Sequence, residues 1–233
     1  LRMAAAGTRI INMSQARQQL AEQLAEAVFQ GVQEDLNHQE RVLLVVSGGS
    51  TPVPFFKALA AKPLPWERVD VTLADERWVD EQSSDSNAKL VREHLLQGEA
   101  SAATFIPLTC SAATPEEGVD EVAKQAESLA WPASVVILGM GGDGHTASLF
   151  PDSPELTLAL ATEELLVAVR TPSQPQPRIT FSADRLHQAR RHILHITGED
   201  KRAVLAKALN GDDVRQLPIR AFLTCPLAIY WAP

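Results

Sequence analysis

Apolar residues recur in two different rhythms along the chain. Between residues 14 and 36 they return at three- and four-residue intervals, which is the spacing of one helix face. Beyond this segment, short apolar runs rich in β-branched residues alternate with helical stretches. Regular alternation of strands and helices predicts an α/β fold with a mainly parallel sheet.

The same pattern places the individual elements. Strands are predicted at 41–48, 69–76, 134–140, 164–170, 178–182, 192–198 and 226–232. Helices are predicted at 14–36, 52–60, 87–96, 115–130 and 201–209, the first capped by Ser14 and the second with Pro52 in its first turn. We expect one domain over residues 1–233: a Rossmann-like, mainly parallel central sheet flanked by helices, with a small additional strand region. Residues 1–13 are expected to be extended or disordered.

Composition and charge narrow the range of partners. Hydrophobic residues make up 45% of the 233 residues and charged residues 21%, as in ordinary globular proteins. The net charge of −8 argues against a nucleic-acid partner and against an anionic membrane surface. An acidic protein that binds an acidic metabolite must gather its few cations locally. The apolar runs are also far too short to span a bilayer.

Cysteine and histidine usage gives little sign of a metal site. Cys110 and Cys225 lack C-x-x-C spacing, so a disulfide scaffold and a thiolate zinc site are not expected. His192 and His195 lie three apart in a predicted strand and therefore point to opposite faces. Two cysteines and the lack of a continuous signal-peptide core favour a cytoplasmic location.

Four predicted strands end in segments that carry candidate chemistry. These segments are Ser47–Thr51, Asp75–Arg77, Gly139–His145 and Thr197–Lys201. Open α/β sheets bind ligands at the carboxyl ends of their strands, so fold logic predicts that the four segments share one crevice.

The first segment, SGGST, joins a strand to a helix. Gly48 and Gly49 free the backbone, so successive N–H groups of Ser47, Ser50 and Thr51 can point one way toward a phosphate or carboxylate at the helix start. It lacks the G-K-[ST] ending of a nucleotide-triphosphate loop, which favours a small phosphate over ATP. A plain tight turn with Thr51 as helix cap is an equally good interpretation.

Charged residues follow two further strands. Asp75 can orient a sugar hydroxyl or move a proton, and Arg77 can hold an anion through two parallel hydrogen bonds. A solvated Asp–Arg pair is the commoner case for such a sequence. Arg178 begins a predicted strand after the loop 171–177, which makes it a second candidate for binding an anion.

Lys201 lies in the first turn of a predicted helix, where its charge opposes the helix dipole. A nearby negative charge should compensate it. Glu199 or Asp200 would serve, and so would a bound phosphate.

The segment ILGMGGDGHTASLFP, residues 137–151, has the G-x-G-x-x-G spacing of a dinucleotide site. Such a site needs a full helix after the glycines, but Pro151 stops a helix before two turns are complete. Asp143 places a negative charge where phosphates would lie. Glu163 and Glu164 precede a strand, whereas the ribose-binding acid should end one. The cofactor interpretation fails.

A catalytic interpretation explains the same residues better. Gly141 and Gly142 leave room for a substrate against the backbone. His145, at a strand-to-helix junction, can accept a proton from water, and Asp143 can hold its imidazole in the productive tautomer. A single histidine is more often structural. Because this one has few side chains nearby to pack against, we favour a catalytic role.

Taken in order, these segments resemble the 6-phosphogluconolactonase family, a branch of the glucosamine-6-phosphate isomerase superfamily. The matching stretches are VSGGSTP, LADERWV with SSDSNAKLVREHLL, LGMGGDGHTASLFP, PRITFS and ITGEDK. GGDGHTASLFP is the most specific of them.

The resemblance implies hydrolysis of 6-phospho-D-glucono-1,5-lactone to 6-phospho-D-gluconate in the oxidative pentose phosphate pathway, without metal or organic cofactor. It implies His145 as general base, with Arg77, Arg178, Lys201 and the Ser47–Thr51 turn on the phosphate or sugar oxygens. It leaves open which cation stabilises the oxyanion, which group is the general acid, and whether the enzyme is functionally coupled to the dehydrogenase that forms its substrate.

Two alternatives are kept. Sugar-phosphate isomerases and deaminases of the same superfamily carry a glutamate where this chain has Phe150, so the resemblance to them is weaker. A non-catalytic sugar-phosphate sensor usually carries a DNA-binding helix pair, whereas one helix precedes the first predicted strand here.

Overall fold

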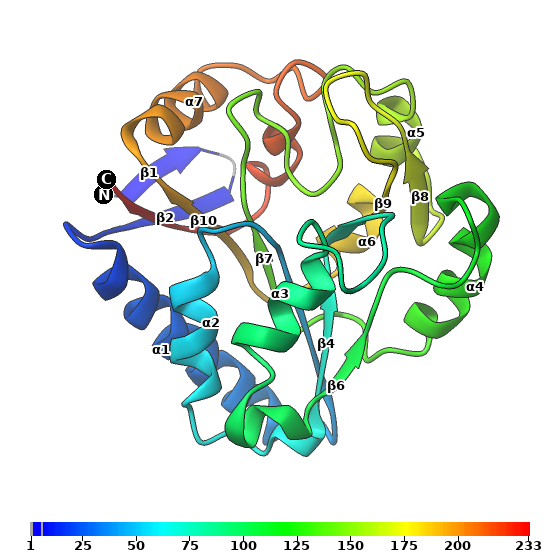
Figure 1. Ribbon diagram of the computed structural model, residues 1–233. Coiled ribbons are helices and arrows are strands. Elements are labelled where there is room, and N and C mark those ends of the chain that lie inside the picture. Colours follow the sequence, from blue (N-terminus) through cyan, green and yellow to red (C-terminus); the bar gives the residue numbers. More distant parts are fainter. Residues whose placement is uncertain (1, 6) are drawn as a thin grey trace.

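The computed structural model describes residues 2–5 and 7–233, and an eight-stranded sheet forms its centre (Figure 1). In spatial order the strands are β1 (Arg2–Ala5), β2 (Gly7–Met13), β11 (Leu227–Ala232), β10 (His192–Thr197), β7 (Val135–Leu138), β3 (Val42–Val46), β4 (Val69–Leu73) and β6 (Thr104–Ile106). Each neighbouring pair is parallel except the edge pair β1–β2. The prediction of a mainly parallel central sheet is confirmed, and the described residues before position 14 are largely extended.

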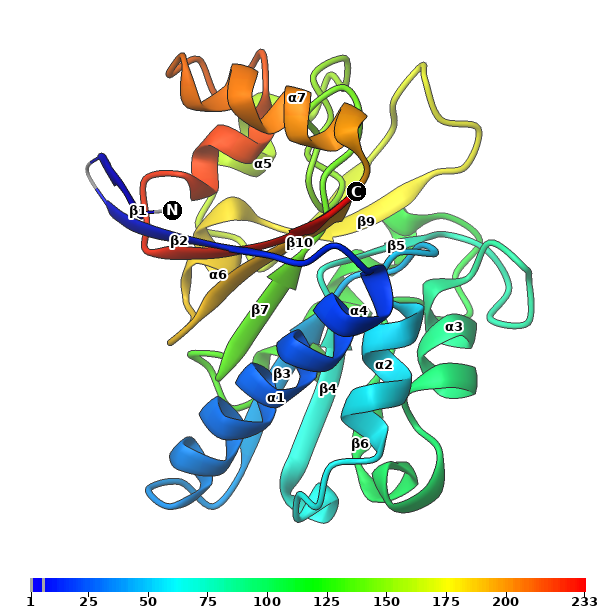
Figure 2. The same cartoon turned by 90° about the vertical axis from the view of Figure 1, so that its left-hand side faces the viewer.

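Helices cover both faces of this sheet. They are α1 (Arg17–Leu36), α2 (Val53–Ala60), α3 (Asn87–His94), α4 (Pro115–Glu127), α5 (Leu156–Ala161), α6 (Ala183–His187) and α7 (Glu199–Leu209), with 3-10 turns at Trp66–Arg68, Gly98–Ala102 and Pro218–Phe222. Figure 2 shows α1 and α2 on one face and α7 on the other.

A second, smaller sheet stands beside the first. It is antiparallel and contains β5 (Asp75–Arg77), β9 (Arg178–Phe181) and β8 (Leu166–Val169), in that order. Helix α4 packs against β8 and β9. The predicted small additional strand region is therefore confirmed.

The single strand predicted at 69–76 is wrong, because the chain changes sheets at Ala74. The residues of β4 are buried throughout, and so are Asp75 and Glu76 of β5, so burial does not mark the break between the two strands. Ala74 N donates to Val46 O in the main sheet, and Ala74 O accepts from Phe181 N in the small one. Ala74 thus joins the two sheets. The charged residues of β5 come to lie beside the carboxyl ends of the strands of the eight-stranded sheet.

Ser14 is not the cap of α1. The helix begins at Arg17, the N-cap position is Ala16, and no side chain caps it. Ser14 N instead donates to Trp231 O at 3.2 Å, so its backbone still belongs to the sheet. Its hydroxyl donates to Gln19 Oε1 at 2.9 Å.

The central strands fix where a ligand can bind. β3, β4 and β7 are buried along their whole length, as expected of parallel strands covered on both faces. Their carboxyl ends meet at one edge, and the polar segments that follow them are gathered there.

Candidate active site

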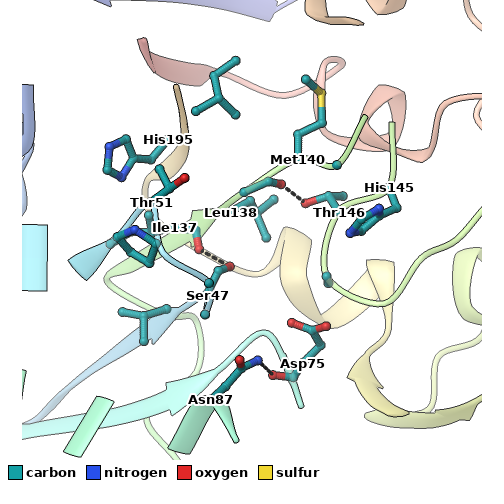
Figure 3. Close-up of a pocket in the computed structure, with 18 of the residues that line it drawn as sticks. Ser47, Thr51, Asp75, Asn87, Ile137, Leu138, Met140, His145, Thr146 and His195 are labelled. Atoms are coloured by element: carbon teal, nitrogen blue, oxygen red, sulfur yellow. Dashed lines mark hydrogen bonds between the residues drawn. The ribbon is translucent and has the colours of Figure 1, made fainter. Parts of the chain in front are cut away.

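A cavity of about 250 Å³ lies at this edge (Figure 3). Residues that follow β3, β4, β7 and β10 all line it, so the four candidate segments do share one crevice. Of the site residues predicted from the sequence, the lining contains Ser47, Gly48, Gly49, Thr51, Asp75, Arg77, Gly141, His145, Arg178 and Lys201. Ser50, Gly142 and Asp143 are not part of the lining.

The SGGST turn is held in place by its neighbours. Ser47 Oγ donates to Ile137 O at 2.8 Å, which ties the end of β3 to β7. A side chain at Gly48 would overlap the amide of Asn87, and Gly49 has a φ of 91°, which favours glycine. No side chain caps α2, whose N-cap position is Pro52. The interpretation of Thr51 as the helix cap is therefore wrong, and no side chain occupies the first N–H groups of α2.

The helix expected directly after the glycines does not form, so the description of His145 as standing at a strand-to-helix junction is wrong. Residues 141–151 make a loop of tight turns. Gly141 N donates to His145 O at 2.9 Å, and Thr146 Oγ1 donates to Gly139 O at 2.8 Å. Gly144 has a φ of 80°, which turns the chain in a way that a helix cannot continue.

Asp143 holds the imidazole of His145. Its Oδ1 lies 2.5 Å from His145 Nδ1 and also accepts from His145 N at 3.0 Å. Burial disfavours the Asp143 carboxylate, but the hydrogen bond and charge of His145 outweigh it and hold the pKa of Asp143 below its usual value. We assign the ring proton to Nδ1, which leaves Nε2 as a proton acceptor. A Cβ on Gly141 would overlap this ring.

Phe150 supports both the histidine and an arginine. Its fully buried ring lies 4.4 Å from the His145 ring, centroid to centroid, and Arg178 Cζ lies 5.3 Å from the Phe150 centroid. A ring face attracts a guanidinium in this range. Sequence reasoning noticed Phe150 only as a missing acid and did not predict this contact.

Positive charge is concentrated in the cavity, as an acidic protein that binds an anion requires. The described lining carries Arg77, Arg178 and Lys201 but, apart from Asp75, no carboxylate. Lys201 Nζ donates to Met140 O at 2.8 Å. Glu199 was one of the expected partners of Lys201, but its Oε2 lies 3.9 Å from Arg202 Nη1.

The two arginines face each other across a strand pair. Arg77 and Arg178 are partners in the β5–β9 register, and like charges so placed repel unless an anion lies near. Burial lowers the pKa of Arg178, and its Nε has no hydrogen-bond partner among residues 2–5 and 7–233. The negative charge of Asp75 already offsets this repulsion, and the unpartnered Nε leaves Arg178 able to bind an anionic oxygen in the cavity.

Asp75 is not a solvated partner of Arg77. It is 7% exposed, and its Oδ2 accepts from Ser148 Oγ at 2.6 Å. Asn87 Nδ2 donates to its carbonyl oxygen at 3.2 Å. Between His145 and Ser148, Ala147 has a φ of 48°, a strained value for a residue with a Cβ. This left-handed residue directly precedes Ser148, which bonds to Asp75.

Sequence reasoning missed Asn87, Ser148 and the cavity contact of His195. Asn87 stood in a polar loop with no distinguishing pattern, and Ser148 was quoted only as part of a motif. His195 was tested only as a metal ligand, yet it lines the cavity and packs edge-on against Phe55. Its burial lowers the pKa of the imidazole to about 4, so this second histidine is neutral at physiological pH.

The described part of the chain contains neither a cluster of metal-ligating side chains nor a membrane-spanning helix. Within it, no group of three or more His, Cys, Asp or Glu side chains is arranged to hold a metal ion. None of its helices combines the length and apolar character that crossing a membrane requires.

Comparison with known proteins shows the family. Residues 15–231 match the family described as glucosamine-6-phosphate isomerases/6-phosphogluconolactonase. The chain belongs to this family. Within the isomerase/lactonase family, a 6-phosphogluconolactonase of Pseudomonas aeruginosa is 47% identical over 212 residues, covering 90% of this chain and 89% of that protein. The resemblance drawn from the ordered motifs is confirmed.

Solved structures of the isomerase/lactonase family agree with the fold. A crystal structure of a 6-phosphogluconolactonase from Shewanella baltica OS155 superposes with a TM-score of 0.95 at 42% identity, covering 97% of this chain and 98% of that one. A monomeric glucosamine-6-phosphate deaminase gives a TM-score of 0.78 at 16% identity, over 96% and 97% of the two chains. The second likeness shows the shared fold alone.

Proposed function

We propose that the protein hydrolyses 6-phospho-D-glucono-1,5-lactone to 6-phospho-D-gluconate. The observation that carries this proposal is the His145–Asp143 pair beside a cavity that also holds three cationic side chains. The names of the full-length relatives support the choice of substrate. A phosphorylated lactone offers the two groups that such a cavity suits, an ester carbonyl and a phosphate.

The reaction needs one proton acceptor that can also return the proton. His145 Nε2 takes a proton from water as the water oxygen bonds to the lactone carbonyl carbon. When the bond from that carbon to the ring oxygen breaks, protonated His145 gives the proton to the departing oxygen. Asp143 accepts from Nδ1–H throughout and stabilises the imidazolium that forms between the two steps.

The cationic side chains and the backbone amides can stabilise the two negative charges of the reaction, which are on the phosphate and on the oxyanion. Arg77, Arg178 and Lys201, with the N–H groups of the Ser47–Thr51 turn, are the groups available for the phosphate and for the developing oxyanion. Asp75, fixed by Ser148, is suited to accept a hydrogen bond from a sugar hydroxyl. A cytoplasmic location and functional coupling to the dehydrogenase that forms the lactone remain predictions.

The direct test measures lactone loss above its spontaneous rate. His145→Ala should lose about 10²–10⁴-fold of the catalysed rate, the usual contribution of a general base. His38→Ala, at an exposed histidine outside the cavity lining, should keep full activity. Circular dichroism checks that each variant folds. A folded His145→Ala enzyme with wild-type activity would contradict the proposed base.

The alternative functions have their own readouts. Phe150 offers no carboxyl group next to His145, so we expect no ammonia release from glucosamine 6-phosphate. Tight binding of the phosphorylated lactone with no turnover would instead support a sensor.

A further inference from the structure

The segment 171–177, which leads into β9 and is drawn in yellow in Figure 2, is fastened to the loop that carries His145. Asp152, two residues after Phe150, accepts a short hydrogen bond from Thr171 Oγ1 and another from Ser173 N at 3.1 Å. The bond from Thr171 lowers the pKa of Asp152, so the carboxylate form that makes these contacts is favoured. The segment therefore has a fixed place beside the cavity.

One glutamine of this segment contacts a cavity arginine, and a second contacts the loop that binds the other arginine. Gln174 Oε1 accepts from Arg178 Nη2 at 2.8 Å. Gln176 Nε2 donates to Asp85 Oδ2 at 2.8 Å, and the carbonyl oxygen of Asp85 accepts from Arg77 Nη1, also at 2.8 Å. One arginine is thus held directly and the other through the loop that contains Asp85.

The group that accepts the hydrogen bond of Arg178 is uncharged. Arg178 is 6% exposed and lies opposite Arg77, so a carboxylate would be the obvious partner for it. The side chain that contacts its Nη2 is instead a neutral amide. An amide oxygen fixes the direction of a guanidinium without cancelling its charge.

We propose that Gln174 is a positioning residue, which aims the Arg178 guanidinium into the cavity while leaving its positive charge for an anionic oxygen of the substrate. This inference rests on the proposed function for the identity of that substrate. It does not depend on hydrolysis itself, since binding of the anion alone requires the same arrangement.

Two substitutions at Gln174 separate this role from a purely structural one. Gln174→Glu keeps an acceptor for Arg178 but cancels its charge, whereas Gln174→Ala removes the acceptor and keeps the charge. We expect 6-phosphogluconate and inorganic phosphate, measured by calorimetry, to bind most tightly to wild type, less tightly to the alanine variant and least to the glutamate variant. The glutamate variant should lose tenfold or more in affinity while melting no lower than wild type.

A matched control exists elsewhere in the chain. Gln216 Oε1 accepts from Arg220 Nη1 at 3.0 Å, outside the cavity lining. Gln216→Glu should therefore leave anion affinity unchanged.

The two proposals fail in different ways. A glutamate variant that binds both anions as tightly as wild type would overturn the role of Gln174, and so would a wild-type protein that binds neither anion. The expected order of affinities without lactone hydrolysis would uphold the role of Gln174 and contradict the proposed function.

Discussion

Lys201 is the cation whose role a single substitution tests most cleanly, because its ammonium donates to the neutral carbonyl oxygen of Met140. A charge-assisted hydrogen bond contributes about 1.5–3 kcal/mol, and each 1.4 kcal/mol is about tenfold in affinity. Lys201→Ala should therefore lower kcat/KM for the phosphorylated lactone about tenfold or more relative to unphosphorylated gluconolactone. Steady-state rates with the two substrates measure this ratio.

The control for Lys201 lies on the same helix. Lys207 is exposed in the last turn of α7 and outside the cavity lining, so Lys207→Ala should change neither rate. Equal losses with both lactones in the Lys201 variant would remove Lys201 from the phosphate site.

At the scale of residues, the sequence predicts groups whose chemistry is unusual for their position. His145 among glycines, Arg178 after a loop and Lys201 against a helix dipole were predicted in this way, and all three line the cavity. Phe150 and Gln174 were not, since an aromatic residue before proline and a glutamine in a loop are common. Their significance is in what they touch, 4.4 Å from His145 in one case and 2.8 Å from Arg178 in the other.

Among the elements, helix α3 depends on a buried carboxyl group that strand β5 supplies. Glu76 is 1% exposed and accepts from Asn87 N, Ala88 N and Arg77 N, so it serves the first N–H groups of α3. Burial raises the pKa of Glu76 from 4.5 to about 7, against the effect of these three bonds. The Glu76 carboxyl group therefore binds a proton more tightly in the folded protein than in the unfolded chain.

The sign of the stability effect follows from this difference. Between about pH 4.5 and 7 the unfolded chain binds fewer protons at Glu76, so this group's stabilisation is full below pH 4.5 and is lost as pH rises to about 7. A shift of this size corresponds to about 3 kcal/mol. The free energy of unfolding of Glu76→Gln should therefore rise by about that amount relative to wild type over this interval. Urea denaturation at several pH values measures it, and parallel curves for the two proteins would contradict the raised pKa.

The strands were easier to predict than the points where they end. The runs in β3 and β7 are apolar and rich in β-branched residues because both faces of these strands are covered, and this leaves a clear pattern. The break at Ala74 leaves no such pattern, because the residues on both sides of it are strand residues that are largely buried. α6 has five residues, too few for a helical period to be recognised.

At the scale of the whole molecule, the cavity unites parts of both sheets. Ser47 and His145 follow strands of the large sheet, Arg77 and Arg178 belong to the small one, and Lys201 lies on α7. The order of the strands in the large sheet makes this convergence predictable, because parallel strands end at one edge. The place of the small sheet was not predictable, since it depends on the turn at Ala74.

A ligand that touches all of these parts should stabilise the folded protein. Binding to the native state alone adds about 2.7 kcal/mol at a ligand concentration one hundred times Kd. For a chain of this size, that corresponds to a rise in melting temperature of about 5–10 °C. We therefore expect 6-phosphogluconate to raise the melting temperature by this amount in a calorimetric scan. Gluconate, which lacks the phosphate, should raise it far less at the same concentration, because the cations gathered in the cavity lose their main partner. Equal shifts with both compounds would mean that the phosphate makes no contact with Arg77, Arg178 or Lys201, and the proposed substrate would then be wrong.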